Sequence, residues 1–415
     1  MPANQSQVLR NSDFRWYFGS RTISLLGDSI HYIALMSLIY QQTRSPIVLG
    51  GALVTIQSSQ ILFDLFSGVA ADRWNRKWTM IACDAYRAVA VIAIPFVLPS
   101  TSLLFLLLFS MACAESFYNL ARASLLPDLL QGEQQLVQAN SLLQAATTMV
   151  MTAGPLVAAA VVVSYGTTTA FLLDGCSFLL AGLLILPLND RQARITRLRA
   201  GLIKELADGY RYFIHQPRIV GVVVTTSLLL SALFLPMSLK IVFADQFIAG
   251  QGFDATSVLG YLSTASGLGG VFGAALLPKL TRQWGVWKII VLGAACASIE
   301  LFCFSVASNL SLLLVATLLS GCAFTFVNVP AMTLLQLTAS NEMRGKVLAL
   351  YSILLSGTTT LAVLGGGLAG STIGLRPVYF FAALLCLGAG YAAFILLRHL
   401  PAAAYPSPCS TNTPQ

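Results

Sequence analysis

The chain has 415 residues, of which 56% are hydrophobic and only 10% are charged, and its mean hydropathy is +0.77. Water-soluble globular proteins usually carry roughly 25% charged residues, so this composition excludes a soluble domain and indicates an integral membrane protein. The net charge of +8 does not indicate a nucleic-acid partner, because the basic residues are distributed as membrane topology requires.

Apolar runs must contain roughly 20 residues to cross a hydrocarbon core of about 30 Å. The sequence contains twelve such runs, which predicts an all-α integral membrane protein with twelve transmembrane helices. The runs lie near residues 16–40, 46–70, 79–99, 102–125, 142–164, 168–188, 219–242, 257–280, 287–307, 310–335, 347–371 and 377–397.

A long polar stretch divides these runs into two equal groups. We therefore expect four parts: an N-terminal six-helix bundle over 1–188, a cytoplasmic linker over 189–218, a C-terminal six-helix bundle over 219–398 and a cytoplasmic tail over 399–415. Paired halves of this kind are typical of secondary transporters, whose substrate site lies between the halves near the middle of the membrane.

The basic residues indicate the orientation of the chain. Of the 24 Lys and Arg residues, only Arg44 and Arg376 fall in the loops that we expect outside, whereas most of the others fall in the termini or in the alternate loops. The positive-inside rule then places both termini in the cytoplasm. Arg10 and Arg15 precede a long first span without a cleavage site, so we expect no signal peptide.

The first span contains ionisable side chains inside an apolar run. Arg21, Asp28 and His31 follow helical spacing and share one face. A charge at the centre of a span costs about 2.5–3.5 kcal/mol, so such a face is expected to line a cavity. We expect Asp28 to bind a coupling proton, His31 to share it and Tyr32 to form part of an aromatic wall. The alternative is that Asp28 only fixes helix packing.

The loop after the second span has a distinctive pattern of charges. The stretch GVAADRWNRKW contains Gly68, Asp72, Arg73, Arg76 and Lys77. Asp72 can accept hydrogen bonds from Arg76 and from the positive N-terminal end of a helix in the other half. We expect these five residues to form a conformational gate. The alternative is that they are ordinary cytoplasmic charges.

This loop resembles the signature of the major facilitator superfamily, with Asn75 in place of a glycine. Further segments, such as NEMRGKVLALYS, resemble the branch that contains the enterobactin exporter and macrolide efflux proteins, and the resemblance extends from Phe14 to Leu397. It implies the major facilitator fold, a bacterial cytoplasmic (inner) membrane location and a monomer. The antiporter signature of the fifth span is reduced to Gly154 and Pro155, and the arginine that many drug antiporters carry in the fourth span is absent.

Two further predictions concern the gate. Asp84 and Arg87 are three residues apart near the cytoplasmic end of the third span, which predicts a local ion pair with a gating or structural role. Asp128, just after the fourth span, is another possible partner of Arg76.

Other polar residues are candidates for the central cavity. Glu115 and Glu300 lie near the middle of the fourth and ninth spans, so either can carry the proton or face the substrate. Tyr118 shares a helix face with Glu115 and is expected to contribute to the aromatic wall, although it can equally belong to the core. Asn328 and Pro330 predict a kinked helix with a polar rim.

Glycines at a spacing of four residues predict close helix packing. Gly269 with Gly273, and Gly366 with Gly370, would let neighbouring backbones approach closely, either for packing alone or for sliding contacts between moving bundles. Seven of the eight cysteines lie within the spans and are expected to be small buried hydrophobes. We expect neither a metal site nor a cofactor.

These features favour a transporter over an enzyme. The sequence lacks the Walker pattern of ATP-driven pumps, the Gly-x-Ser-x-Gly motif of hydrolases and the His-Glu-x-x-His motif of zinc proteases. We expect a proton antiporter that exports a bulky amphipathic molecule by alternating access, which means siderophore export or, for a macrolide-type drug, antibiotic resistance. Its expected partners are this substrate, protons and the lipid bilayer. The alternative is a facilitator or proton-coupled importer of a polar nutrient, and a receptor or scaffold without transport is a further possibility.

Overall fold

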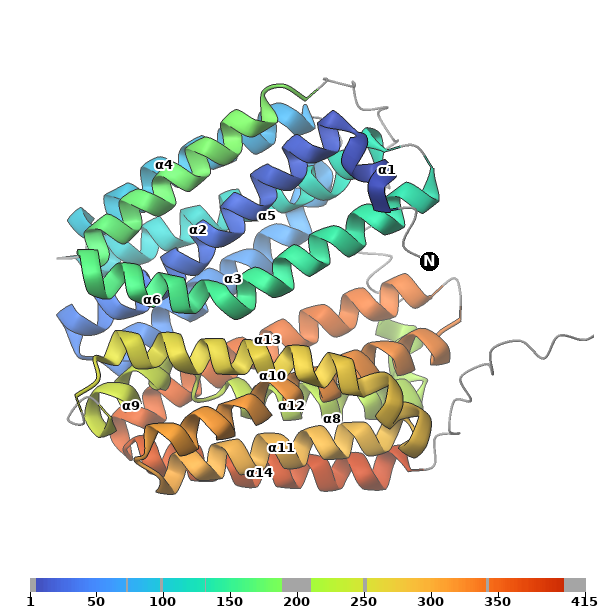
Figure 1. Ribbon diagram of the computed structural model, residues 1–415. Helices are drawn as coiled ribbons and strands as arrows, with labels where there is room; N and C mark the ends of the chain where they lie inside the picture. Colours follow the sequence, from blue (N-terminus) through green and yellow to red (C-terminus); the bar gives the residue numbers. More distant parts are fainter. Residues whose placement is uncertain are drawn as a thin grey trace, which may run out of the picture.

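The computed structural model describes residues 5–71, 74–97, 100–130, 132–188, 210–248, 252–340 and 343–398. Two stacked helical bundles form the molecule (Figure 1). The first bundle consists of α1 Gln5–Arg10, α2 Ser12–Thr43, α3 Pro46–Ala71, α4 Arg76–Val97, α5 Thr101–Leu129 and α6 Glu133–Ile185. The second consists of α8 Pro217–Phe234, η1 Met237–Leu239, α9 Lys240–Phe247, α10 Ala255–Trp284, α11 Val286–Val306, α12 Leu310–Thr338, α13 Arg344–Thr372 and α14 Leu375–Leu397.

Eleven helices in the described part of the chain are long and apolar enough to cross a membrane. The longest, Gln134–Ile185, has 52 residues and would measure about 78 Å if straight, more than twice the thickness of a hydrocarbon core. Its backbone leaves helical geometry at Gly166, where φ is 84° and ψ is 165°. The chain folds back there, so α6 supplies two spans (Figure 1). The all-α membrane fold is thus confirmed, and this reversal accounts for the twelfth predicted pass.

The seventh predicted span is also interrupted. The α8 helix ends at Phe234, a short 3₁₀ turn follows, and α9 resumes at Lys240. Pro236 lies in this break and has no N–H group to continue the helical hydrogen bonds. The second part of the span can therefore take its own direction.

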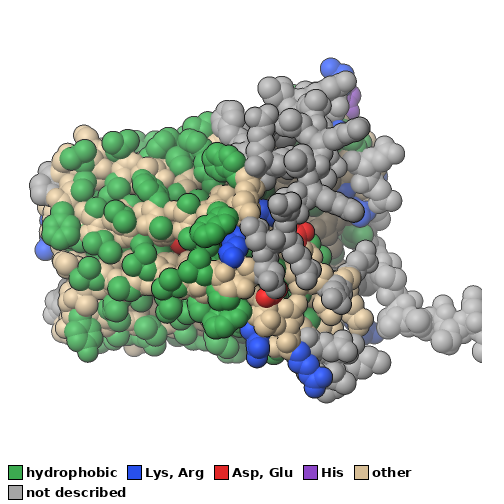
Figure 2. Space-filling view, turned by 90° about the horizontal axis from the view of Figure 1, so that it is seen from above, with side chains coloured by type: hydrophobic (Ala, Val, Ile, Leu, Met, Phe, Trp, Pro, Cys, Tyr) green, Lys and Arg blue, Asp and Glu red, His purple; other side chains and the backbone are tan. Residues whose placement is uncertain are grey.

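The outside of the bundles is apolar. Hydrophobic side chains cover most of the visible surface of the first bundle, whereas many of the visible Lys and Arg side chains gather towards one end (Figure 2). Phe96 and Met149 are 75% and 72% exposed, which would be costly in water but suits contact with lipid. We call the end that carries Leu188 and Arg398 the linker end, and the opposite end the Arg44 end.

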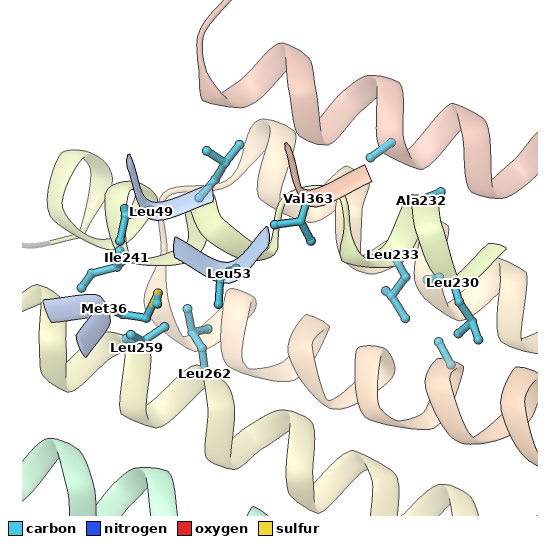
Figure 3. Packing of buried hydrophobic residues seen from close by; sticks show 14 of the residues in the cluster. Met36, Leu49, Leu53, Leu230, Ala232, Leu233, Ile241, Leu259, Leu262 and Val363 are labelled. Carbon is cyan, nitrogen blue, oxygen red and sulfur yellow. The ribbon is translucent and has the colours of Figure 1, made fainter. Parts of the chain in front are cut away.

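Buried hydrophobic residues join the two bundles towards the Arg44 end. Met36 and Leu53 of the first bundle belong to the same buried cluster as Ile241, Leu259 and Val363 of the second (Figure 3). In addition, α10 packs on α6 and α13 packs on α3. These contacts close the interface at this end of the molecule.

The close helix packing predicted from the glycines is confirmed. A Cβ atom at Gly273 would lie 3.1 Å from the Cα atom of Cys322, and one at Gly370 would lie 2.8 Å from the Leu239 side chain. At Gly269, a Cβ atom would overlap the Leu318 carbonyl of α12, and at Gly366 it would overlap the carbonyl of Leu235, directly after α8.

Some predictions fall on residues that the structure does not describe. Asp72, Arg73, the residues from 189 to 209 and the tail after Arg398 lie outside the described ranges, and Gly68 belongs to a part of α3 of which only the backbone is described. The four predicted parts and the gating role of the loop therefore stay predictions.

Candidate functional site

A cavity with a volume of about 300 Å³ lies between the bundles. Its ionisable lining residues are Asp28, His31, Arg87 and Glu115, and apart from Met237 of η1 the whole lining comes from α2–α6. Asp28 and Glu115 lie near the middle of α2 and α5, so the cavity lies about halfway along the spans.

Apolar and aromatic side chains form the rest of the wall. They include Leu35, Leu53 and Met111, together with the rings of Tyr32 and Phe178. Three methionines line the cavity in all, and methionine side chains adapt readily to irregular apolar ligands.

A second cavity of about 280 Å³ adjoins the first, since the two share Gln57 and Met237. It adds Gln60 of α3 and Ser356 and Thr359 of α13 to the lining, so residues of both bundles border the combined space. The hydroxyl of Thr360 donates to Gln57 Oε1 at 2.9 Å, which links the bundles directly beside the cavity.

Arg87 connects the acidic residues around the first cavity. Its Nη2 donates to Asp28 Oδ1 at 2.9 Å, whereas its Nη1 lies 3.9 Å from Asp84 Oδ1. Arg21 approaches the other oxygen of Asp28 at 3.9 Å. The predicted pair of Asp84 and Arg87 is therefore present, but the shorter contact of Arg87 reaches across to α2 and places its guanidinium in the cavity wall.

An aromatic ring covers this guanidinium. Its central carbon lies 4.0 Å from the centre of the Phe178 ring, within the range of a cation–π interaction. The centre of the Tyr118 ring lies 5.7 Å from the same guanidinium carbon. Tyr118 is 1% exposed, however, and packs in the core rather than in the described cavity walls.

His31 does not pair with Asp28. Its Nδ1 lies 3.2 Å from Asp174 Oδ2, and Asp174 is fully buried on α6. The Ser177 hydroxyl donates to the other oxygen of Asp174 at 3.3 Å. Gly27 leaves the space for this group, because a Cβ atom at this position would overlap Asp174 and Ser177.

Glu115 has a different kind of partner. The amide of Gln60 donates to Glu115 Oε2 at 3.1 Å. Gln57 and Gln60 lie three residues apart on α3, inside an otherwise mostly apolar run. Their spacing places both amides on one helix face, and this spacing is the feature of the sequence that could have predicted a polar face on α3.

The structure places Glu300 and Asn328 elsewhere. Glu300 is 2% exposed within the second bundle, where its Oε1 lies 3.7 Å from Lys240 Nζ. Neither residue lines the two cavities described above, whereas Asp28, His31, Tyr32 and Glu115 do. Their roles stay predictions.

The described gate residues are joined at the linker end. Arg76 of α4 forms an ion pair with Asp128 and donates from Nη1 to the Ser124 carbonyl at 2.9 Å. Lys77 donates to the Leu188 carbonyl at 2.8 Å. The start of α4 is thus tied to the ends of α5 and α6.

A second polar group lies at the Arg44 end, and no pattern in the sequence predicts it. Asp245 Oδ2 of α9 accepts hydrogen bonds from Arg44 Nη1 and from the Tyr40 hydroxyl, each at 2.8 Å. The neighbouring Tyr40 hydroxyl, and then the charge of Asp245, raise the pKa of the Arg44 guanidinium. The hydroxyls of Ser37 and Thr256 lie 2.7 Å apart across the same interface. We call Tyr40, Arg44 and Asp245 the latch.

The described residues contain no group of three or more His, Cys, Asp and Glu side chains placed to hold a metal ion. What the site offers instead is a partly open space with apolar walls and a few ionisable groups near the middle of the spans. Such a space suits reversible binding of a ligand and of protons.

Comparison with known proteins also points to a membrane transporter. The bacterial protein BacE of Bacillus subtilis, named a bacilysin exporter, is 25% identical over 353 residues, which are 82% of this chain and 84% of BacE. The staphyloferrin A transporter of Staphylococcus aureus is 20% identical over 343 residues, 81% of this chain and 84% of its own. These relatives do not establish the branch predicted above.

Solved structures show the same architecture. The crystal structure of the nucleoside transporter NupG superposes with a TM-score of 0.77 and covers 93% of this chain and 99% of its own. Its identity is 14%, so it shows the fold alone. The family profile of the Major Facilitator Superfamily matches residues 17–359. The chain therefore belongs to the Major Facilitator Superfamily and is a multi-pass membrane transporter of that type.

Proposed function

We propose that the protein is a secondary active exporter that moves a bulky amphipathic molecule across the bacterial cytoplasmic membrane in exchange for protons. The main support is the cavity between the bundles, where methionine, leucine and aromatic side chains surround only a few ionisable groups. An apolar wall suits the body of such a molecule, and the ionisable groups suit its polar part and a proton. The name of BacE as an exporter favours outward transport.

The orientation follows from the distribution of basic residues. If the linker end faces the cytoplasm, as the positive-inside rule predicts, the latch and the buried cluster close the outer side of the cavity. The described conformation would then receive substrate from the cytoplasm. The substrate is a siderophore or a macrolide-type drug in this proposal, and the relative named for staphyloferrin A is compatible with the first.

The proposed cycle uses the acids of the first bundle. Substrate enters from the cytoplasm, the bundles rock about the cavity, and the latch opens as the gate closes at the linker end. Protons from outside bind Asp28 or Glu115 as the substrate leaves. Arg87 holds Asp28 in place, and the pair of His31 and Asp174 lies next to it on the same wall and can receive the proton in turn.

The test is cellular accumulation of labelled macrolides and of a labelled siderophore in a host that lacks its main efflux pumps. The wild type should lower accumulation of one compound only while the proton gradient is intact. Asp28→Asn should reduce this gradient-dependent efflux by about tenfold or more, because the partly buried carboxylate that accepts from Arg87 and would bind the proton is lost. Asp254→Asn, which removes a carboxylate outside the cavity and keeps a capping side chain for α10, is the matched control.

Two results would refute the proposal. A nutrient analogue that accumulates faster in cells with the protein would support the importer or facilitator instead. Efflux that a protonophore leaves unchanged would exclude proton antiport. Membrane levels of each variant, measured by immunoblot, separate these results from poor expression.

A further inference from the structure

The charges that line the cavity do not balance. Its described lining contains two carboxylates, Asp28 and Glu115, and one guanidinium, Arg87. The remaining ionisable residue, His31, lies beside the buried carboxylate of Asp174, so a protonated His31 would be balanced by Asp174 and would not offset the lining acids. With both lining acids ionised, the lining therefore carries one negative charge in excess. Beside the lining, Arg21 adds one positive charge and Asp84 adds one negative charge, so these two neighbours do not change the balance.

Asp28 is not the source of this excess. Arg87 donates to it at 2.9 Å, and Arg21 approaches its second oxygen at 3.9 Å. Asp28 thus has two basic neighbours. Arg87 also acts on Glu115 through its charge, but its close contacts are to Asp28 and Asp84 and to the ring of Phe178.

Glu115 is the lining acid that accepts its hydrogen bond from a neutral donor, whereas Asp28 accepts from a guanidinium. The Gln60 amide donates to one of its oxygens, and an amide satisfies a hydrogen bond without cancelling the charge. Because an ionised carboxylate at the centre of a span is costly, the site is completed either by a proton or by a positively charged ligand group.

The other side chains define the rest of the ligand. Met36, Met111 and Met237 line the same space with Leu108 and Ile56, and Gln57 adds an amide at the junction of the two cavities. A ligand that fills this space needs a large apolar body, and a single positive charge placed near Glu115 would neutralise the wall.

We infer that the substrate of this site is a lipophilic organic cation and that Glu115 binds its positively charged group. This inference rests on the proposed function, since it names the chemical class of the exported molecule. A proton and the cation would then compete for Glu115, so binding of one would favour release of the other. A polycarboxylate, in contrast, would add negative charge to a wall that already has an excess.

The test uses two probe ions of nearly the same shape and opposite charge. Binding of tetraphenylphosphonium and of tetraphenylborate is measured on the purified full-length protein in nanodiscs, and binding to protein-free nanodiscs is subtracted. The wild type should bind the phosphonium at least about tenfold more tightly than the borate. Glu115→Gln should weaken phosphonium binding by about tenfold and change borate binding by less than about twofold.

Two further variants make the result specific. Glu115→Asp keeps the charge and should retain the preference for the cation, whereas Asp254→Asn removes a carboxylate outside the cavity and should change neither affinity. If Glu115→Gln does not fold, the comparison of the two ions on the wild type still decides whether the site prefers a cation. The inference is wrong if the borate binds as tightly as the phosphonium, if neither ion binds, or if the folded Glu115→Gln variant keeps the wild-type preference.

Failure of this inference can be told apart from failure of the proposed function. A protein that lowers cellular accumulation of a compound but prefers tetraphenylborate remains an exporter, with an anionic substrate. A protein that binds the phosphonium through Glu115 but imports a nutrient analogue retains the inferred site and loses the export role.

Discussion

Arg87 holds the ionisable side chains of the first bundle together. It is 4% exposed, contacts Asp28 and Asp84 and lies against the Phe178 ring. A buried charge of this kind is stabilised only while its partners remain, so removal of one partner leaves the others uncompensated.

We predict that Arg87→Met destabilises the protein by about 3–5 kcal/mol, because Asp28 and Asp84 lose their shared cation inside the membrane. Thermal unfolding of the purified protein in detergent measures the effect. Arg44→Met is the matched control, since the Arg44 side chain is 62% exposed and solvent screens its ion pair, so the loss of stability should be much smaller. Adding Asp28→Asn to Arg87→Met should recover part of the loss. Equal unfolding temperatures for the two single variants would contradict this reading.

The sequence could predict which residues are polar but not how they pair. The spacing on the first span placed Arg21, Asp28 and His31 on one helix face, and Asp28 and His31 do line the cavity. Their partners Arg87 and Asp174 come from other helices, far away in sequence, and no periodicity reports such contacts. For Asp174, the sequence shows only that an acid lies within an apolar span, which does not identify His31 as its partner.

At the scale of elements, the α2–α3 turn and α9 form the contact that closes one end of the cavity. Arg44 and Tyr40 belong to the first bundle, whereas Asp245 lies on the short helix that follows the break after α8. Because α9 is separate from α8, the latch can open without displacing the whole span. The Arg44 end should therefore respond to charge changes in these residues.

We predict that Arg44→Asp shifts the protein towards the conformation open at the Arg44 end, and that Arg44→Asp combined with Asp245→Arg reverses the shift. The pair is partly exposed, so the population should change by only a few fold. Spin labels at Leu103 and Val306, introduced after replacement of the native cysteines, report the distance across this end. Unchanged distances in Arg44→Asp, or no recovery in the double variant, would exclude the latch as a determinant of this equilibrium.

Element boundaries followed the apolar runs only in part. The fifth and sixth predicted spans both belong to α6, because only Gly166 within this helix departs from helical geometry. The seventh span is broken, although its hydropathy is high throughout. Hydropathy reports where the membrane is crossed, whereas such breaks depend on individual backbone angles and on packing against neighbouring helices.

At the scale of the whole molecule, the two bundles enclose a cavity that is sealed on one side. Apolar runs and basic loops were enough to predict two groups of six spans, since both follow from the properties of the bilayer. They could not predict which side is closed. That depends on contacts between the bundles, such as Gly367 against Pro46 and the hydroxyl of Thr360 against Gln57, which only the folded arrangement brings together.

The most direct measurement of the central claim, proton-driven export, uses everted membrane vesicles with an acidic interior and a pH-sensitive dye. The added compound is the one whose accumulation the protein lowers in cells. For the wild type we predict that the compound enters the vesicles while protons leave, and that Asp28→Asn loses this exchange. Entry at an unchanged rate after the gradient is dissipated, or movement of protons and compound in the same direction, would contradict the account.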